Sequence, residues 1–513
     1  MTDKIKAAIF DLDGVITSTA STHSTAWKQM FDEYNERRKN EGKDPYQPFT
    51  IEIDYINYVD GKPRYMGVKD FLSSRKIILP FGDPGDPPDA ETICGLGNRK
   101  NNIFLGIVEK EGAEVLDKNV EKAKKWKSMG IKLGIVSSSK NCEMILKAVH
   151  LDDLFETMID GIISAERGYN GKPAPDIFVK AAEELGVAPS ESLIVEDALV
   201  GVEAGKNGNF GLVIGIADEN KAEMMLKHGA DIVVDTLERM PKNPIPIRQP
   251  GQLSSALEDF KEILQECKGK KLFLFLDYDG TLTPIVEDFN AAFLSEDMRN
   301  LVKEISESCP MAIITGRDIK DIKDLVKIDQ IHYAGSHGFD MVGPDGFIFE
   351  NEQANESRRT ITEVSEEIRD KTAHIQGVKL EYKKYAIAVH YRQVSDNQQK
   401  DAKEIVYDII SQYPEIRPGK GKKVIEMKPN FDWHKGKSIR VLLDRMIGKD
   451  QGDNFLIYIG DDITDEDAFF EVLDDGIGIL VGDHGRKTFA SSHLRDVDEV
   501  KLFLQRILDD LKA

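Results

Sequence analysis

The chain has 513 residues, against roughly 150 for one typical domain, so we expect two or three compact units. Hydrophobic residues make up 41% and charged residues 31% of the sequence, an ordinary globular composition that excludes general disorder. The formal net charge of −22 repels phosphate backbones and argues against a nucleic-acid-binding protein, while leaving room for local anion sites.

The cysteines and the lengths of the apolar runs indicate in which cell compartment the protein is expected. The four cysteines show no C-x-x-C spacing, which argues against a disulfide framework or a zinc site. The longest apolar runs, such as residues 272–276, are far shorter than the roughly 20 residues that cross a bilayer. Residues 1–10 lack the pattern of an export signal. We therefore expect a cytoplasmic protein without a membrane partner; the oligomeric state stays open.

Two segments about half a chain apart repeat one pattern: an apolar run, then Asp-x-Asp-Gly, then a hydroxyl residue. They read IFDLDGVIT at 9–17 and FLDYDGTLT at 275–283, which predicts two related units in tandem. Four prolines between them, within residues 241–250, favour an extended linker. The predicted first unit, linker and second unit are residues 1–240, 241–252 and 253–513.

Short apolar strands alternate with helical patterns in both halves. Examples are KLGIV and SLIVE in the first half and LFLFL and LIYIG in the second. Continuous apolar strands indicate parallel sheets covered on both faces, so we predict two α/β, Rossmann-like cores. Ligands of such sheets bind beyond the carboxyl ends of the strands. Residues that directly follow each strand are therefore the candidates for chemistry.

An aspartate pair follows the first strand of each half: Asp11 and Asp13, then Asp277 and Asp279. Residues i and i+2 of a strand point the same way, so each pair faces one site. Close carboxylates need a cation or a proton, and Mg²⁺ prefers such oxygen ligands. The pattern suggests attack by the first Asp on phosphorus and proton transfer by the second. A solvated acidic turn would explain any isolated copy.

Three further kinds of residue follow in the same order in both halves. A hydroxyl residue can hydrogen-bond a phosphate, a lysine can neutralise it, and acids can ligate a divalent cation. Taken singly, each is more simply a turn, a surface lysine or a helix cap. Their ordered recurrence favours a phosphotransfer site in each half. The residues are Ser137, Lys172, Glu196 and Asp197 in the first half, and Thr315, Lys435, Asp461 and Asp465 in the second.

The long insertions fall at different places in the two halves. In the first half the insertion separates the aspartate pair from Ser137, which places a cap at about residues 18–110. In the second half it separates Thr315 from Lys435, which places a cap at about residues 340–430. We expect a helical cap in the first half and an α+β cap in the second. Such caps exclude water and read the leaving group.

On these residues the chain resembles the haloacid dehalogenase superfamily over nearly its whole length. The second half resembles trehalose-6-phosphate phosphatases in LDYDGTL, ITGRD, GSHGFD, IEMKP, DWHKGKSI and GDDITDEDAF. That resemblance implies Asp277 as nucleophile, Asp279 as acid/base, Thr315 and Lys435 as phosphate ligands, and metal-side acids at Asp461 and Asp465. It also implies disaccharide-reading residues in the cap, although a solvated strand face would explain them as well: Lys383, His390, Arg392, Glu426 and Lys428.

The first half resembles the β-phosphoglucomutase group in FDLDGVITST, VSSSKN, KPAPDIF and VEDALVG. The resemblance implies Asp11 as nucleophile and Asp13 as acid/base. Its cap departs from that group in DYINYVDGKPRYMGV and in the loop at residues 81–89, which leaves mutase activity open. The other implied residues are Ser137 and Lys172 for phosphate, Glu196 and Asp197 for metal, and His23, Lys140 and Asn141 for substrate.

We therefore predict a Mg²⁺-dependent phosphatase that hydrolyses trehalose 6-phosphate through an aspartyl-phosphate in its second half. The first half is predicted to act on a hexose phosphate, so the expected partners are small sugar phosphates. Two alternatives remain. In one, the main activity of the protein is that of a β-phosphoglucomutase or another hexose-phosphate phosphatase. In the other, the first half is a non-catalytic scaffold or sensor.

Overall fold

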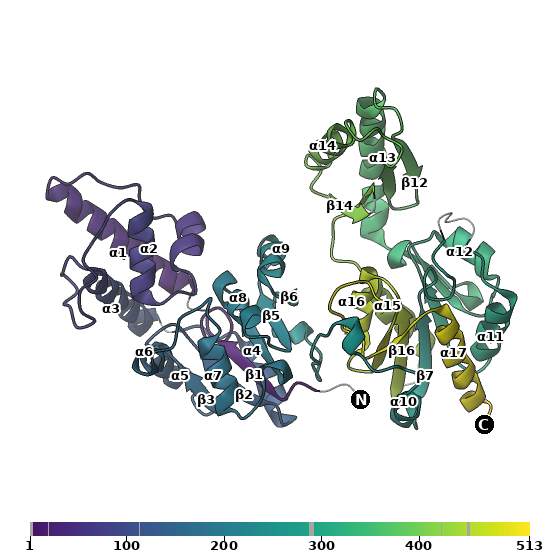
Figure 1. The fold of residues 1–513 in the computed structure, drawn as a ribbon, viewed down its shortest axis with the longest axis horizontal. Helices are drawn as coiled ribbons and strands as arrows, with labels where there is room; N and C mark the ends of the chain where they lie inside the picture. Colours follow the sequence, from purple (N-terminus) through teal and green to yellow (C-terminus); the bar gives the residue numbers. More distant parts are fainter. Residues whose placement is uncertain (1–3, 19, 112, 287–291, 422, 449–451) are drawn as a thin grey trace. The chain divides into compact units, whose positions relative to one another are not determined.

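The computed structural model describes residues 4–18, 20–111, 113–286, 292–421, 423–448 and 452–513. The chain forms two compact units, which divide between Ile247 and Arg248 (Figure 1). None of the described helices is long and apolar enough to cross a membrane. Each unit holds a central sheet, helices on that sheet, and an inserted cap.

The first unit contains a six-stranded parallel sheet in the order β3-β2-β1-β4-β5-β6. The chain order reverses between β1 and β4, and ligands of doubly wound sheets bind at such a point. This agrees with the predicted parallel core. The strands are β1 (Ala7–Asp11), β2 (Lys132–Val136), β3 (Thr157–Ile159), β4 (Ser192–Glu196), β5 (Leu212–Ile216) and β6 (Ile232–Val234).

Helices cover the sheet of the first unit. Ile9 and Ile194 of the sheet pack with Phe178 and Val202 of two of these helices in one fully buried cluster. The helices are α4 (Asp117–Ser128), α5 (Cys142–Ala148), α6 (Gly161–Arg167), α7 (Asp176–Glu184), α8 (Leu199–Asn207) and α9 (Glu219–His228), with short turns η2 (Pro189–Glu191) and η3 (Leu237–Arg239).

The cap of the first unit is helical, as expected. Stacked and edge-on aromatic rings form its core, with Phe31 at 4.1 Å from Phe71 and 5.2 Å from Phe49 between ring centroids. Because this core is separate from that of the sheet, the cap is a second small body on top of the site. Its elements are α1 (Ala20–Asn40), η1 (Ile51–Val59, a π-helix), α2 (Arg64–Ser74) and α3 (Ile93–Glu111).

The second unit contains an eight-stranded sheet in the order β11-β10-β9-β8-β7-β16-β17-β18. It is parallel from β9 to β18, whereas β10 and β11 are antiparallel to their neighbours, so the sheet is mixed. The strands are β7 (Lys271–Leu276), β8 (Met311–Ile314), β9 (His332–Gly335), β10 (Asp340–Val342), β11 (Ile348–Glu350), β16 (Asn454–Gly460), β17 (Gly476–Val481) and β18 (Ser492–Leu494).

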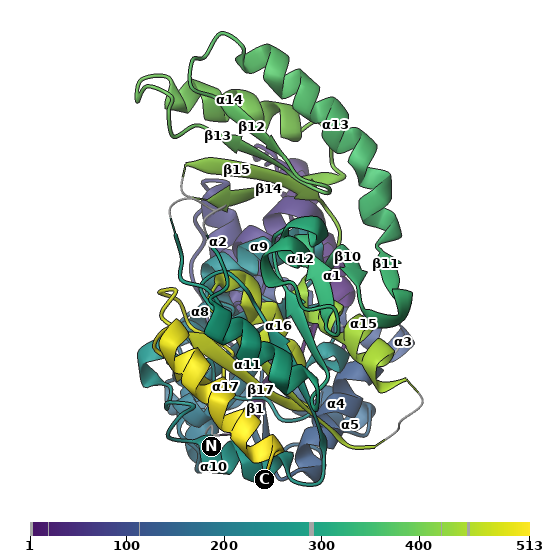
Figure 2. The same ribbon diagram turned by 90° about the vertical axis from the view of Figure 1, so that its right-hand side faces the viewer.

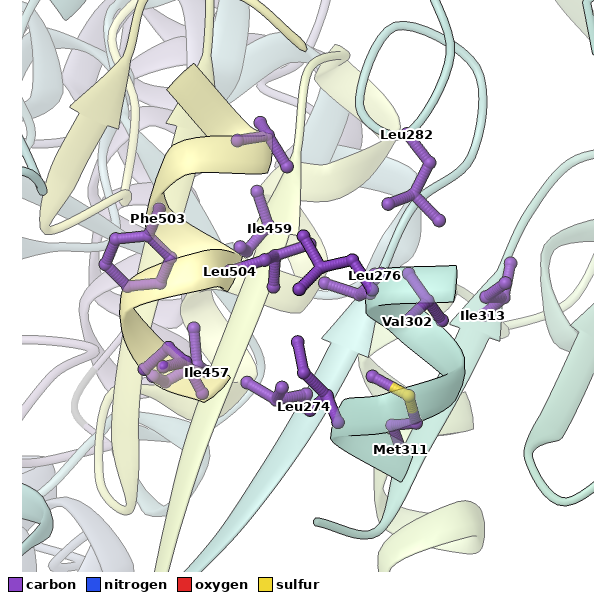
Figure 3. Close-up of a cluster of buried hydrophobic side chains, with 14 of the residues drawn as sticks. Leu274, Leu276, Leu282, Val302, Met311, Ile313, Ile457, Ile459, Phe503 and Leu504 are labelled. Atoms are coloured by element: carbon purple, nitrogen blue, oxygen red, sulfur yellow. The ribbon is translucent and has the colours of Figure 1, made fainter. Parts of the chain in front are cut away.

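Two helices with side-chain caps cover one face of this sheet. Ser295 accepts a hydrogen bond from the Met298 amide at the start of α11, and Asp496 caps α17 through the Glu499 amide. Figure 3 shows apolar side chains of both helices meeting those of the central strands. The remaining core elements are α10 (Phe260–Cys267), α11 (Glu296–Ser306), α12 (Ile319–Val326), α15 (Lys435–Ile447), α16 (Glu466–Val472), α17 (Val497–Leu511), η4 (Pro250–Gln252), η6 (Ser336–Gly338), η7 (Pro344–Gly346) and η8 (Ile463–Asp465).

The cap of the second unit is a four-stranded antiparallel sheet in the order β12-β13-β15-β14, with two helices beside it (Figure 2). Ile361 and Val406 of these helices pack on Val389 and Met427 of the sheet. This α+β cap starts after β11, later than the predicted residue 340, because β10 and β11 complete the core sheet. Its elements are α13 (Glu352–Thr372), β12 (Lys379–Tyr382), β13 (Ile387–His390), α14 (Gln399–Ile410), β14 (Ile416–Gly421) and β15 (Val424–Pro429).

The proline-rich segment is attached to the units on both sides. The Trp126 ring N–H donates to the Pro241 carbonyl at 3.3 Å, and the Ile247 amide donates to Gly211 at 2.9 Å. The Arg248 backbone pairs with that of Thr488 in the second unit. Residues 241–249 form neither helix nor strand, and most of them lie against protein rather than free in solvent.

Truncation of Leu504 should destabilise the second unit. This α17 side chain is fully buried against the sheet, so Leu504→Ala removes apolar contacts and leaves a cavity. We expect a loss of about 2–5 kcal/mol in unfolding free energy, measured by urea denaturation. The matched control is Leu502→Ala on the same helix, where 46% of the side chain is already exposed. An equal loss in both variants would contradict the assigned core.

Candidate functional site

The first unit gathers its predicted phosphotransfer residues at one edge of the sheet. Asp11 ends β1 and lies beside Val136 of β2, so Ser137 follows at the same edge. Lys172 is buried and donates hydrogen bonds to Asp11 and to Glu196, the last residue of β4. A buried cation therefore lies between two carboxylates, and these groups line one cavity.

The second unit repeats this arrangement with different elements. Asp277 follows β7, and Thr315 follows the neighbouring parallel strand β8. Lys435, the first residue of α15, is 3% exposed. Its ammonium group lies 2.7 Å from Asp277 Oδ1 and 2.7 Å from Asp465 Oδ1. The sequence prediction that these residues converge is therefore consistent with the geometry.

Three carboxylates in each unit have oxygens within 4.8 Å of one another and can hold a metal ion. Such a set offers only hard oxygen ligands, the donors that suit magnesium or calcium better than a soft metal. Each set includes one oxygen of the candidate nucleophile of its own unit, Asp11 or Asp277. The sets are Asp11 with Glu196 and Asp197, and Asp277 with Asp461 and Asp465.

The two units deliver one of these carboxylates from different chain positions. In the first unit Glu196 ends the strand, and a Cβ on Gly201 would lie 1.8 Å from its Oε1. In the second unit Gly460 ends the strand instead, and a Cβ there would lie 2.4 Å from Asp465 Cγ. A glutamate before the turn and an aspartate after it thus reach equivalent places beside the buried lysine, and each needs a glycine at the other position.

Burial without a metal ion disfavours the charged form of three carboxyls of these sets, Asp11, Asp277 and Asp461. Burial raises the pKa of Asp11 to about 8, and nearby Glu196 and Asp13 add to it while Lys172 opposes it. Burial likewise raises the pKa of Asp277 to about 7 and that of Asp461 to about 8. A divalent cation at these sets would favour the ionised, nucleophilic form of the carboxylates.

The second aspartate of each pair lies outside these metal-binding sets. Arg317 holds Asp279 through two hydrogen bonds of 2.7 and 2.5 Å. Asp13 Oδ2 lies 3.6 Å from the His23 ring. Both side chains are therefore placed next to the first aspartate but turned toward other partners. The sequence pattern does not predict this role for Arg317, although the residue follows the hydroxyl strand in the motif ITGRD.

The first unit encloses a cavity of about 350 Å³ between cap and sheet. The predicted substrate residues His23, Lys140 and Asn141 line it together with Asp11. Arg64 of the cap lines it as well, and its guanidinium shares the Asn101 side-chain oxygen with the Asn141 amide. The cavity wall thus carries cationic and amide groups that come from chain segments other than the one that holds Asp11.

The sequence does not predict two cap residues that line the cavity, Lys100 and Arg64. Lys100 is 4% exposed, and its ammonium group lies 2.5 Å from His23 Nδ1. Burial, with the charge of Arg64, lowers the pKa of Lys100 to about 7. Neither Arg64 nor Lys100 follows a strand of the sheet or recurs in the second half, so the repeated order of motifs gave no signal for them.

One core residue of the second unit, His337, lies within the electrostatic influence of three of the five predicted cap readers. Lys428, Glu426 and Lys383 all act electrostatically on its ring, and Lys383 donates to Glu426 at 2.8 Å. The other two readers lie at and just after the end of β13, where His390 is half-buried and Arg392 is exposed. His390 pairs with Glu381 at 2.7 Å.

His337 itself was not predicted. Its backbone has φ 58°, a left-handed conformation rare outside glycine, and its buried Nδ1 atom has no hydrogen-bond partner within the described chain. Burial and the charges of Lys435 and Lys428 lower its pKa to about 3, so the ring is neutral. The motif GSHGFD contains it, but strain and burial are visible only in the fold.

Family comparisons match each half separately. The family model for haloacid dehalogenase-like hydrolases matches residues 5–209, and that for trehalose-phosphatase matches residues 275–499. A β-phosphoglucomutase of Mycobacterium bovis is 44% identical over 46% of this chain and 92% of its own length. A probable trehalose-phosphate phosphatase of Arabidopsis thaliana is 41% identical over 50% of this chain and 75% of its own.

A longer relative matches both halves at once. An uncharacterized glycosyl hydrolase of Mycobacterium tuberculosis is 33% identical over 99% of this chain. The chain spans only 38% of that relative's length. The tandem arrangement of the two halves therefore also occurs within a larger protein.

The raised pKa values predict how stability depends on pH when metal is chelated. The folded chain holds protons on Asp11, Asp277 and Asp461 up to pH 7–8, whereas unfolded Asp loses its proton near pH 3.9. Between these limits the folded state binds more protons, so stability falls as pH rises. We expect the thermal midpoint in EDTA to drop by several degrees from pH 5 to pH 8.

Substitution separates this effect from general charge effects. Asp461→Asn should flatten the pH dependence, because the amide does not titrate. Asp297→Asn, at an exposed position of α11, is the control and should leave the slope unchanged. A midpoint that rises from pH 5 to pH 8 in EDTA would contradict the assigned environment.

Proposed function

Because the chain belongs to the haloacid dehalogenase superfamily, with a β-phosphoglucomutase-like half and a trehalose-phosphatase half, we propose that residues 253–513 hydrolyse trehalose 6-phosphate to trehalose and phosphate. The observation that carries this is the convergence of Asp277, Lys435, Asp461 and Asp465 beneath a cap whose polar face holds Lys383 and Glu426. The first set suits a phosphate, and the second suits sugar hydroxyls.

In the proposed mechanism Asp277 attacks phosphorus and forms an aspartyl-phosphate. Lys435 neutralises the nucleophile and the phosphoryl oxygens, and the Thr315 hydroxyl donates a hydrogen bond to one of them. Asp279 gives a proton to the leaving sugar oxygen and then removes one from the attacking water. For that step Asp279 must exchange Arg317 for the substrate.

We propose Mg²⁺ as the metal and Asp277, Asp461 and Asp465 as the side chains that would hold it. The donor set fits, because three carboxylates converge and burial disfavours the negative charges of Asp277 and Asp461. When bound, Mg²⁺ would supply charge stabilisation to the phosphoryl oxygens. The corresponding residues of the first unit are Asp11, Glu196 and Asp197.

We further propose that residues 1–240 interconvert hexose phosphates, as a β-phosphoglucomutase does. The specific support is a cavity with cationic or amide groups in two places: Lys172 beside Asp11, and Arg64, Lys140 and Asn141 elsewhere on its wall. A phosphate transferred within one sugar requires two phosphate-binding places, one for each end of a bisphosphate. A simple phosphatase needs only one.

We propose a cytoplasmic location and small-molecule partners. The four cysteines are free in the structure, which supports a reducing, cytoplasmic location. Sugar phosphates, rather than nucleic acid or membrane, are the proposed partners, in keeping with the net charge of −22.

Paired nucleophile substitutions test both activities in the intact chain. Asp277→Asn should lower trehalose 6-phosphate hydrolysis roughly a thousandfold or more, since it removes the covalent route, and should leave β-glucose 1-phosphate conversion unchanged. Asp11→Asn should do the reverse. Each variant is thus the folding control of the other. Full phosphatase turnover in Asp277→Asn would refute the proposed site.

Metal dependence is tested by calorimetry as well as by turnover. Mg²⁺ at about a hundredfold over its dissociation constant should stabilise the second unit by about 2.7 kcal/mol, since it binds only the folded site. Asp461→Asn should reduce that stabilisation, and EDTA should abolish hydrolysis until Mg²⁺ is restored. Unchanged melting on adding Mg²⁺ would speak against the assigned ligands.

A further inference from the structure

A turn of the second unit's cap rests on the core sheet. Residues 383–386 join β12 to β13, and the Lys383 amide donates to the Ala386 carbonyl at 2.9 Å. Tyr385 in this turn is fully buried, with its ring centroid 5.6 Å from that of Phe339 in the core. The cap therefore touches the core here, in addition to the two places where the chain enters and leaves it.

Lys384 makes the polar part of this contact. Its ammonium group lies 2.9 Å from Asp340 Oδ2 and 2.6 Å from Glu350 Oε1. These two acids stand directly opposite each other on the antiparallel strands β10 and β11. Like charges in that position destabilise a strand pair. The core thus presents a repelling acidic pair, and the cap supplies a positive charge to it.

A second contact joins the same turn to the phosphate side of the site. The backbone amide of Lys384 lies 3.4 Å from Asp318 Oδ2, and Asp318 Oδ1 accepts from the Ser336 hydroxyl at 2.9 Å. Asp318 belongs to the short segment that follows Thr315, the proposed phosphate ligand. The turn is therefore tied to the chain segment that positions the phosphate.

The neighbouring residue of the turn points to the sugar side. Lys383 donates to Glu426 of β15 at 2.8 Å, and the charges of both groups act on the His337 ring. Adjacent lysines thus have different partners: Lys384 binds the core sheet, and Lys383 binds the polar face of the cap. A shift of the turn would move Lys383 relative to the phosphate ligands.

We propose that Lys384 is a positioning residue that seats the turn 383–386 on the core and thereby fixes Lys383 and Glu426 at the distance from Thr315 that a disaccharide phosphate requires. The proposal rests on the function proposed for the second unit. Groups that bind a part of the substrate remote from phosphorus contribute only when they are held in register with the reacting centre.

The two ion pairs of Lys384 differ in exposure. Glu350 is 45% exposed, so solvent weakens its pair, whereas Asp340 is 7% exposed and loses its cationic partner when Lys384 is replaced. Loss of Lys384 should therefore cost some stability at the edge formed by β10 and β11 while the rest of the unit stays folded. The difference between a substrate with a sugar and one without it separates a positioning role from a structural one.

The test compares Lys384→Met, Lys384→Arg and the control Lys371→Met in the full-length protein. Lys371 is a cap lysine that pairs with Glu367 of its own helix, so its loss removes a similar charge away from the core. Amide hydrogen exchange reports on the turn without substrate. Turnover of trehalose 6-phosphate and of p-nitrophenyl phosphate, which has no sugar, reports on positioning.

Lys384→Met should speed exchange in residues 383–386 but not in α17, and should raise KM for trehalose 6-phosphate roughly tenfold. Its kcat/KM for p-nitrophenyl phosphate should stay at the wild-type value. Lys384→Arg, which keeps a donor for both acids, should restore most of the affinity, and Lys371→Met should behave as wild type.

Two results would overturn the proposal: unchanged exchange of the turn in Lys384→Met, or equal losses on both substrates together with a lower thermal midpoint. Failure of the proposed function looks different. In that case the unaltered protein would not hydrolyse trehalose 6-phosphate, and the exchange experiment alone would decide whether Lys384 seats the turn.

Discussion

The pairing of a buried lysine with two buried carboxylates is the interaction on which both sites depend. Lys172 and Lys435 are almost inaccessible to solvent, yet each stays charged because two acids outweigh the effect of burial and raise its pKa. Removing one partner of such a group leaves an uncompensated charge in a medium of low dielectric. The lysine, its two acids and the strand ends that carry them therefore act together and fix where a phosphate can bind.

The two units preserve this charge arrangement while the chain positions that supply it differ. Glu196 of the first unit comes before the turn that follows the strand, and Asp465 of the second unit comes after the corresponding turn. Gly201 and Gly460 leave the space that these two carboxylates need. Electrostatics thus constrains the place of the carboxylate and leaves its sequence position free. The caps, whose attachment points also differ, are then able to change the substrate without disturbing the phosphate-binding groups.

The sequence predicted the residues that follow strands, because strand ends of a parallel sheet must meet at one edge. It did not predict His337, Arg64 or Lys384, whose importance arises from contacts between segments far apart in the chain. It also missed the antiparallel direction of β10 and β11, since apolar periodicity marks a strand but not its direction. The cap therefore begins later than expected.

Strands β10 and β11 connect the core sheet to the cap, which holds the residues proposed to bind the sugar. They place Asp340 opposite Glu350, an arrangement unfavourable within the sheet alone and compensated by a lysine of the cap. The first unit reaches its cap differently: cap residue Asn101 bridges Arg64 of the cap and Asn141 of the core inside the cavity. In the second unit the acids that pair with Lys384 have no proposed role in binding substrate, whereas in the first unit the bridging groups line the cavity, where a ligand would compete for them. Substrate binding should therefore rearrange the cap–core contact in the first unit and preserve it in the second.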